Sequence, residues 1–514
     1  MNLLRSALTL RPLHHAVMLL TLSVPFWYGV PAHAQLSLPS MGDGAEITAN
    51  EERRLGDSII RSLYRDPDYV DDPQLHAYVM HIWHPLVEAA KQRGDMSEEL
   101  SERFAWQILL GRDQSINAFA LPGGYLGVHL GLIAAVSSSD ELATVLAHEL
   151  THVTQRHIAR MIGEEKKSMP LMVASLLLGA LAASKSPDAA NALIVGGQAA
   201  AIQNQLGFSR DMEREADRIG YSLLAPAGFA PQGAVSMFEK LQQASRLNDN
   251  GSWPYLRSHP LTTERMADMQ ARAPQGRLQP PKPSMEHTIM AARARVLGRP
   301  SADKLREWAK QPQQPEFAQL SVLEQAGQWY ASALSYAQLR DADRARESWE
   351  ALHALLNAQG DVRARQQAKW LRMEIELAAG KPNVALQWAA TGNDAARTTR
   401  PELLLSSRAW LAAGQASKVS DRLQTWVLDD PRDAAAWHLL AQAWQAQGHV
   451  LRGLRAEAEA YVAHYDYPAA IDRLKAGQDA ARQASTTSDY MDASIIDTRL
   501  REVQSLWREQ SREQ

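Results

Sequence analysis

The sequence predicts a mainly α-helical protein, in which an N-terminal α+β domain with a small sheet precedes a C-terminal solenoid of paired helices. Three patterns predict this class: a helix carrying two inward-facing histidines, short extended segments around a Pro-Gly-Gly turn, and glycines that recur every 34 residues. The chain has 514 residues, 45% of them hydrophobic, so it is long enough for more than one core. Its formal net charge of −4 offers nucleic acid no electrostatic attraction, and we expect no nucleic-acid partner.

The first 34 residues have the composition of a secretory signal peptide. Two arginines precede an apolar stretch over residues 16–30, and the Ala-His-Ala run at 32–34 supplies a small-x-small cleavage pattern. An uncleaved membrane anchor is the alternative, although the apolar stretch is short for one. The chain has no cysteine, so an exported protein would be stabilised without disulfides. We therefore predict removal of residues 1–34 and a periplasmic location.

The segment that follows predicts a helical region and then a small sheet. Residues 47–92 have helical periodicity, and residues 104–110 have the apolar, aromatic composition of a strand. Two short extended segments then lie within residues 116–128, joined at Pro-Gly-Gly. An exposed edge strand here can pair with the backbone of a bound peptide, which makes recognition largely independent of side chains. An ordinary hairpin is the alternative.

Residues 148–152 read His-Glu-Leu-Thr-His and lie in a predicted helix that begins at a capping box of Ser138 and Glu141. Histidines four apart share one helix face, so His148 and His152 can bind one Zn²⁺ from the same side. Glu149 projects about 100° around the helix, close enough to take a proton from metal-activated water. The alternative is a buried helix whose histidines only satisfy hydrogen bonds in the core.

Two histidines do not complete a catalytic zinc site, which usually has three protein ligands and a water. His157 lies five residues after His152, rotated about 140° away from the metal face in a continuous helix. The best candidate for the third ligand is Glu213 on a separate helix, because Glu213 and Asp217 are four apart and share a face. One carboxylate can then bind the metal while the other orients a ligand histidine. An exposed, charged helix with pairs between residues four apart is the alternative.

One further stretch, residues 168–184, is uncharged but carries a proline and three serines. At 17 residues it falls short of the roughly 20 apolar residues that span a bilayer. We interpret it as a core helix near the histidines, or as a helix that lies on a membrane surface. Membrane contact is therefore expected to be at most peripheral.

A proline-rich segment, residues 274–284, predicts an extended linker and a domain boundary between residues 35–273 and residues 285–514. Beyond it the chain has helical periodicity, and Gly380, Gly414 and Gly448 recur at intervals of 34 residues. That interval is the length of a tetratricopeptide repeat, whose stacked units form a concave binding surface. The repeat signature is degenerate, and a generic helical bundle is the alternative.

The motif at 148–152, with Glu213 and Asp217 about sixty residues later, resembles the zinc metallopeptidase family that includes HtpX and the CAAX prenyl endopeptidases. The resemblance implies a zincin-type domain and one Zn²⁺ per chain bound by His148, His152 and Glu213. It also implies Glu149 as general base and Asp217 as a supporting residue. The chain departs from the membrane-embedded members by lacking transmembrane helices, so prenylated or transmembrane substrates are not expected.

The signal peptide, the lack of spans and the repeats make the chain similar to periplasmic members of this family over nearly its whole mature length. That similarity implies unfolded or misassembled outer-membrane β-barrel proteins as substrates. It also implies the outer-membrane β-barrel assembly machinery as a partner of the repeat domain. Unassembled barrel proteins expose unpaired strand edges, which suits capture by an edge strand.

A further segment that matches the family runs from His259 to Arg265 and begins His-Pro-Leu. His259 can stabilise the oxyanion of the tetrahedral intermediate, or it can bind zinc in place of the water. Our hypothesis is the second role, so that the resting enzyme is latent until the loop with His259 moves. The polar stretch 247–252 just before this segment motivates the hypothesis. A surface histidine before proline is the alternative.

The sequence thus predicts a zinc-dependent endopeptidase, and the resemblance implies that the protein also acts as a chaperone. The competing hypothesis is a non-proteolytic assembly chaperone or scaffold, in which zinc is mainly structural and the repeats hold the client. Glu149 argues for the enzyme, because a purely structural zinc site needs no base beside it.

Overall fold

The computed structural model describes residues 47–164, 209–246, 253–272, 284–389, 398–482 and 487–512. The predicted signal peptide, the uncharged stretch 168–184, the polar stretch 247–252 and nearly all of the proline-rich linker lie outside these residues. Within them the fold is mainly α-helical with one small sheet, followed by a series of helix pairs, which confirms the predicted fold class.

The N-terminal part combines short strands with helices that begin at polar caps. Its elements are α1 (Ala49–Tyr64), β1 (Tyr69–Val70), α2 (Pro73–Arg93), α3 (Glu98–Arg103), β2 (Gln107–Gly111), β3 (Ala118–Leu121), β4 (Tyr125–His129), α4 (Leu130–Ala135), α5 (Ser139–Thr154), α6 (His157–Glu164), α10 (Arg210–Leu224), α11 (Gln232–Arg246), α12 (Tyr255–Ser258) and α13 (Thr263–Arg272).

The four strands form one sheet in the order β1-β2-β4-β3. β2 and β4 are parallel, whereas β3 and β4 form an antiparallel hairpin in which Ala118 is opposite Val128. The hairpin turns at Gly123 and Gly124, which both have positive φ (74° and 84°), a conformation that glycine adopts without steric cost. In the strand order β3 lies at one end, so it is an edge strand of the sheet and at the same time one arm of a hairpin.

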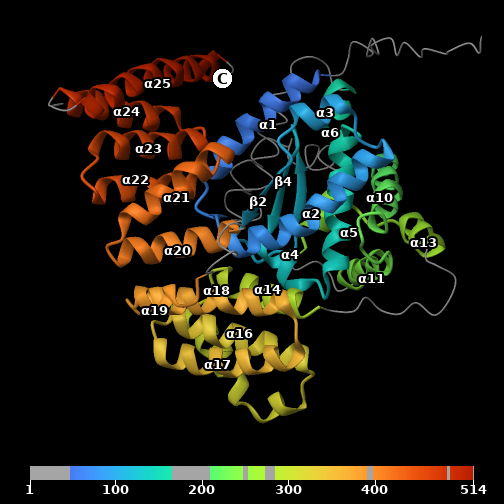
Figure 1. Ribbon diagram of the computed structural model, residues 1–514. Coiled ribbons are helices and arrows are strands. Elements are labelled where there is room, and N and C mark those ends of the chain that lie inside the picture. The colour runs from blue at the N-terminus through green and yellow to red at the C-terminus, as the bar shows by residue number, and fades with distance from the viewer. Residues whose placement is uncertain are drawn as a thin grey trace, which may run out of the picture. The chain divides into compact units, whose positions relative to one another are not determined.

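Helix α5 carries the two paired histidines and is buried on nearly all sides from Glu141 to Thr154. It contacts β3 on one side and α10 and α11 on the other, so that in Figure 1 it stands between the sheet and these two helices. A helix buried all round must be apolar or carry polar groups with partners. The histidines of α5 are buried polar groups that have partners.

Three local predictions need correction. The helical region 47–92 is two helices, because the chain turns between Arg65 and Asp72, forms β1 there, and restarts at Pro73. The expected strand 104–110 begins only at Gln107, because Trp106 has a positive φ of 49°. At the start of α5 only half of the capping box forms.

The hydroxyl of Ser138 accepts a hydrogen bond from the Glu141 backbone N–H at 3.2 Å, as the capping box requires. The Glu141 carboxylate, however, accepts from the backbone N–H of Ser137 at 2.6 Å and from Lys240 of α11 at 2.6 Å. The glutamate thus ties the start of α5 to α11 instead of closing the box.

The C-terminal part consists of helices joined by short turns. Its elements are α14 (Met285–Leu297), α15 (Ala302–Lys310), η1 (Gln311–Gln313), η2 (Pro315–Gln319), α16 (Val322–Gln338), α17 (Ala342–Gln359), α18 (Val362–Ala378), α19 (Pro382–Leu386), α20 (Arg400–Ala412), α21 (Ala416–Asp429), α22 (Ala434–Ala446), α23 (Val450–Ala463), α24 (Tyr467–Ala481) and α25 (Thr487–Arg512). Gly380, Gly414 and Gly448 each lie between two of these helices with φ of 68–79°, so the 34-residue interval marks equivalent turns.

The buried guanidinium of Arg293 on α14 joins elements that are far apart in the sequence. It forms ion pairs with Asp72, the N-cap of α2, at 2.5 Å and with Glu374 of α18 at 2.7 Å. It also donates to the Tyr330 hydroxyl on α16 at 3.2 Å. A buried charge is tolerated only with such partners, so this cluster fixes α2 against the first helices of the C-terminal part.

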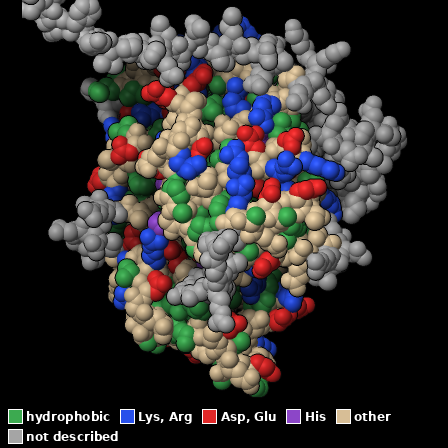
Figure 2. Space-filling model, turned by 90° about the vertical axis from the view of Figure 1, so that its right-hand side faces the viewer, with side chains coloured by type: hydrophobic (Ala, Val, Ile, Leu, Met, Phe, Trp, Pro, Cys, Tyr) green, Lys and Arg blue, Asp and Glu red, His purple; other side chains and the backbone are tan. Residues whose placement is uncertain are grey.

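In the described residues no helix is both long and apolar enough to cross a membrane. Figure 2 shows acidic and basic side chains interspersed over one face of the molecule, in keeping with a net charge near zero.

Candidate metal centre

Four buried side chains from three segments converge beside the sheet: His148 and His152 on α5, Glu213 on α10, and His259 just after α12. One ligand atom from each lies within 4.8 Å of all the others. The Nε2 atoms of His148 and His152 are 3.0 Å apart, and His259 Nδ1 lies 2.9 Å from Glu213 Oε1. The chain therefore gathers four metal-binding groups that the sequence separates by more than a hundred residues.

Close packing of α10 against α5 brings the two helices together. A Cβ atom on Gly220 of α10 would lie 3.1 Å from the backbone carbonyl of Ala147, so only glycine fits without displacing a neighbour. α10 begins at Ser209, whose hydroxyl accepts from the Met212 backbone N–H. One turn into the helix, Glu213 faces α5, and Asp217 follows on the same face.

Asp217 orients the first histidine, and Arg265 of α13 holds Asp217. The Nδ1 atom of His148 lies 3.0 Å from Asp217 Oδ1. Arg265 donates to both oxygens of Asp217, at 2.6 and 2.9 Å, and its Nη1 lies 2.7 Å from Glu213 Oε2. Because a carboxylate only accepts hydrogen bonds, neutral His148 must carry its proton on Nδ1, which leaves the lone pair on Nε2.

A second chain of contacts orients the other histidine. His157 is fully buried at the start of α6, with Nδ1 2.7 Å from His152 Nδ1 and Nε2 3.1 Å from Glu215. Burial lowers the pKa of His157 to about 4, so this ring is neutral. Glu215 accepts from its Nε2–H, so His157 Nδ1 accepts from His152 Nδ1–H. His152 therefore also presents the lone pair of Nε2.

With both rings neutral, the two Nε2 lone pairs face each other across 3.0 Å beside the Glu213 carboxylate, an arrangement that favours a cation there, either a proton or a metal ion. Burial lowers the pKa of His148, but hydrogen bonds to Asp217 and Glu213 outweigh burial and raise that pKa to about 10. Burial and the neighbouring His148 hold the pKa of His152 well below its usual range. Two imidazoles and a carboxylate match the donor set of a divalent metal such as zinc.

Glu149 lies beside this cluster and is fully buried. Its Oε2 accepts a hydrogen bond from the backbone N–H of Ala120 on edge strand β3 at 2.9 Å, and its Oε1 lies 3.4 Å from His259 Nε2. Burial raises the pKa of Glu149 above its usual range. A carboxylate with a raised pKa, next to a candidate metal site and an edge strand, is placed to exchange protons with a bound molecule.

The structure therefore brings together all six residues that the sequence singled out as site candidates, namely His148, Glu149, His152, Glu213, Asp217 and His259.

Two residues that support the site were not predicted from the sequence. A continuous helix would turn the side chain of His157 away from the metal face, because His157 lies five residues after His152. The helix instead ends at Thr154 and turns at Arg156, where φ is 52°, which returns the His157 ring to His152. For Arg265, the only indication in the sequence of a role at the site is its place in the family-like segment that begins at His259.

Comparison with known proteins agrees with this geometry. Residues 76–273 match the model of Peptidase family M48. The chain is 30% identical over 481 residues to the Beta-barrel assembly-enhancing protease of Escherichia coli (strain K12), covering 91% of this chain and 92% of that protein. It is 34% identical over 327 residues to a putative Beta-barrel assembly-enhancing protease of Vibrio cholerae, covering 62% and 64% of the two chains. It is also 36% identical over 159 residues to the Mitochondrial metalloendopeptidase OMA1 of Arabidopsis thaliana, covering 31% of this chain and 30% of that one.

Proposed function

The chain belongs to peptidase family M48 and is a metallopeptidase, and from this premise we propose that it is a zinc-dependent endopeptidase. Its zinc ligands in this proposal are His148, His152 and Glu213, and its general base is Glu149. The observation that carries the proposal is the pair of imidazole Nε2 atoms 3.0 Å apart beside Glu213, with a second buried carboxylate next to them. Two imidazoles and one carboxylate are the protein ligands of many catalytic zinc sites.

A zinc ion bound by these residues supplies Lewis-acid activation of a water molecule and of the scissile carbonyl. Glu149 takes the proton of the attacking water and later passes it to the leaving amine. Its raised pKa suits both transfers, because the carboxylate must accept a proton at neutral pH and then release it. The Ala120 N–H on β3 holds the carboxylate in place, so the strand that can pair with a substrate backbone also positions the base.

His259 gives the site a fourth protein donor, with Nδ1 2.9 Å from Glu213 and 3.3 Å from His148 Nε2. Zinc sites with four protein ligands are closed, whereas catalytic sites keep one position for water. We therefore propose that His259 occupies the position of the water and keeps the resting enzyme latent. Activation requires that the segment carrying His259 leave the site, while Asp217 continues to orient His148.

We also propose a place of action and a class of substrate. A signal peptide over residues 1–34 would export the chain to the periplasm, where the chain would degrade misassembled outer-membrane β-barrel proteins and act as a chaperone for unassembled ones. Similarity to proteins named for β-barrel assembly, over nearly their whole length, supports this proposal. A division into a protease domain (35–273) and a tetratricopeptide-repeat domain (285–514) would let the second bind the β-barrel assembly machinery.

The proposal is tested with zinc-loaded protein and an unfolded outer-membrane β-barrel protein as substrate. Glu149→Gln should retain zinc and lose cleavage by at least about a hundredfold, because the general base is gone. His259→Ala should raise basal cleavage, because a position opens for water. Normal cleavage by Glu149→Gln would refute the assigned base, and unchanged or lower cleavage by His259→Ala would refute the latency.

A further inference from the structure

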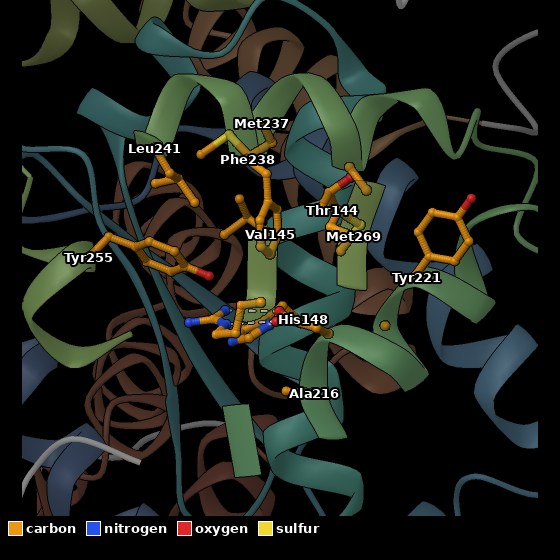
Figure 3. A pocket seen from close by; sticks show the side chains of 14 residues that line it. Thr144, Val145, His148, Ala216, Tyr221, Met237, Phe238, Leu241, Tyr255 and Met269 are labelled. Carbon is orange, nitrogen blue, oxygen red and sulfur yellow. Dashed lines mark hydrogen bonds and ion pairs between the residues drawn. The ribbon is translucent and has the colours of Figure 1, made fainter. Parts of the chain in front are cut away.

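A groove of about 300 Å³ lies on the C-terminal helices, between α21, α22, α23 and the start of α25. These helices belong to the stack that Figure 1 shows in orange and red. Every residue that lines the groove lies on them, and none of these residues lines the small cavity beside His148 that Figure 3 shows. The groove is therefore a feature of the C-terminal part alone, and the candidate metal centre does not use it.

The floor of the groove is apolar. Trp437, Leu440 and Trp444 follow one another on one face of α22, and Val427 of α21 also lines the groove. All four side chains are buried, with at most 8% of each exposed. The indole N–H of Trp437 donates to the carbonyl of Pro431 at 3.0 Å, which fixes that ring. The floor thus offers a preformed aromatic surface, which favours a large apolar side chain as its occupant.

The rim of the groove exposes apolar side chains that the fold leaves uncovered. Leu428, near the end of α21, is 79% exposed, the largest fraction for any large apolar side chain in the described residues. On α25, Tyr490 and Met491 directly precede the lining residue Asp492 and are 63% and 64% exposed. A single exposed apolar residue is ordinary, but several of them beside an apolar groove mark a binding surface.

The wall formed by α23 carries positive charge, because Arg452 and Arg455 both line the groove from one face of this helix. Arg452 has partners. It forms an ion pair with Asp492 at 2.9 Å, and its guanidinium lies over the Trp444 ring, 5.2 Å from the centroid. Arg455 has no ion-pair or hydrogen-bond partner within the part of the chain that the structure describes. One arginine is thus available to pair with an anionic group of an occupant.

The size and the charge of the groove together define its occupant. A volume of about 300 Å³ is at the lower end of the range for ligand sites, which suits one or two large side chains of a bound segment. We propose that the groove binds a segment of a partner protein in which a large apolar side chain lies next to an aspartate or glutamate. The apolar side chain packs on Trp437 and Trp444, and the carboxylate pairs with Arg455.

The two parts of this contact have different weights. Most of the affinity comes from the apolar side chain, because a buried anchor contributes more than an ion pair at an exposed rim. The charge selects among segments, since a basic segment would meet two arginines. Binding at this groove does not depend on whether the N-terminal site cleaves peptides.

The test begins with a random peptide library displayed on phage and selected on the full-length Glu149→Gln protein, which should not cleave the peptides. Selected sequences should share a large apolar residue within one or two positions of an aspartate or glutamate. Fluorescence anisotropy with a labelled synthetic copy of the best peptide then gives the Kd. Replacement of its apolar residue by serine should raise the Kd at least about tenfold. Replacement of its acidic residue by serine should raise the Kd about two- to fivefold.

Substitutions at the rim connect binding to this groove. Leu428→Asp should raise the Kd at least about tenfold, because it removes an apolar contact and adds a charge that repels the peptide carboxylate. The matched control is Val362→Asp, which changes a side chain that is 70% exposed on α18 and does not line the groove. The control should leave the Kd unchanged. Both positions are exposed, so neither substitution should disturb the fold.

A reversal of charge tests the part that Arg455 plays. Arg455→Glu should weaken binding of the selected peptide. A peptide with lysine in place of the acidic residue should bind the Arg455→Glu protein more tightly than it binds the protein with Arg455. A merely structural role of Arg455 would not reverse the preference in this way.

Three results would overturn the proposal: selection of no such peptides, equal Kd values for the Leu428→Asp and Val362→Asp proteins, or no reversed preference in Arg455→Glu. A dimer in sedimentation experiments that Leu428→Asp dissociates would assign the groove to a second copy of the chain and would also overturn it. None of these results bears on the proposed protease function, which is tested by cleavage and zinc content.

Discussion

The Nδ1 atom of His157 lies 2.7 Å from the Nδ1 atom of His152, so one buried histidine orients another that faces the candidate metal site. Glu215 completes the chain at 3.1 Å from His157 Nε2, and Arg160 in turn lies 3.1 Å from Glu215. A carboxylate more often contacts a ligand histidine directly, as Asp217 does for His148. The two proposed histidine ligands are thus supported in two different ways.

We expect His157→Leu to weaken zinc binding roughly ten- to hundredfold, because His152 loses the acceptor that fixes its tautomer and orientation. The measurement is the dissociation constant for zinc, determined by competition with a chelator of known affinity. His157→Asn, whose amide can replace Nδ1, should recover part of the loss.

His287→Leu is the matched control for this prediction. His287 is equally buried and makes two contacts, with the Tyr78 hydroxyl at 2.6 Å and the Val136 carbonyl at 2.9 Å, but it is not among the metal donors. It should destabilise the fold and leave zinc affinity unchanged. Equal zinc affinity in His157→Leu and the wild type would show that the His157 contact plays no part in metal binding.

Zinc affinity should also depend on pH. Without metal, the carboxylates of Asp217 and Glu213 raise the pKa of His148 to about 10, so this ring is protonated at neutral pH. Zinc must displace that proton, and a lower proton concentration therefore favours binding. Between pH 6 and 8 the affinity should rise about tenfold per pH unit, after correction for the chelator. Affinity that is flat over this range would contradict the charge state assigned to His148.

The buried Arg293 should be important for stability. Arg293→Met leaves Asp72 buried without its partner, which should lower the free energy of unfolding by about 3–5 kcal/mol in urea titrations. Arg306→Met removes an exposed partner of Asp303 and should cost less than about 1 kcal/mol. Similar losses in the two proteins would mean that the Arg293 cluster does not hold α2 against the C-terminal helices.

The sequence alone predicts those features of the fold and the site that depend on a fixed spacing between residues. The interval of four between His148 and His152, and again between Glu213 and Asp217, places each pair on one helix face. The 34-residue glycine interval likewise marks equivalent turns. These patterns are local, so helix geometry alone links them to structure.

The missed features depend on breaks in that regularity. The turn at Arg156 returns His157 to the site, and the turn at Trp106 shortens the strand, and neither is glycine, the residue that usually marks a positive φ. Arg265 reaches the site through its bond to Asp217 of α10, and Tyr255 lies beside His148 of α5; both contacts are tertiary information that no spacing encodes. The Glu141 carboxylate accepts hydrogen bonds from Ser137 and Lys240 and not from the backbone N–H of Ser138. The position of Lys240 is likewise set by tertiary packing.

The proposed activity depends on one zinc ion bound by His148, His152 and Glu213. The most direct measurement is the metal content of the purified, folded protein and of Glu213→Ala, taken together with cleavage by each in the His259→Ala background. We predict one zinc per chain and cleavage when Glu213 is present, and loss of both when it is replaced. A folded protein that cleaves its substrate without bound metal, or a Glu213→Ala protein that keeps its zinc and its activity, would show that these three residues do not form the catalytic zinc site.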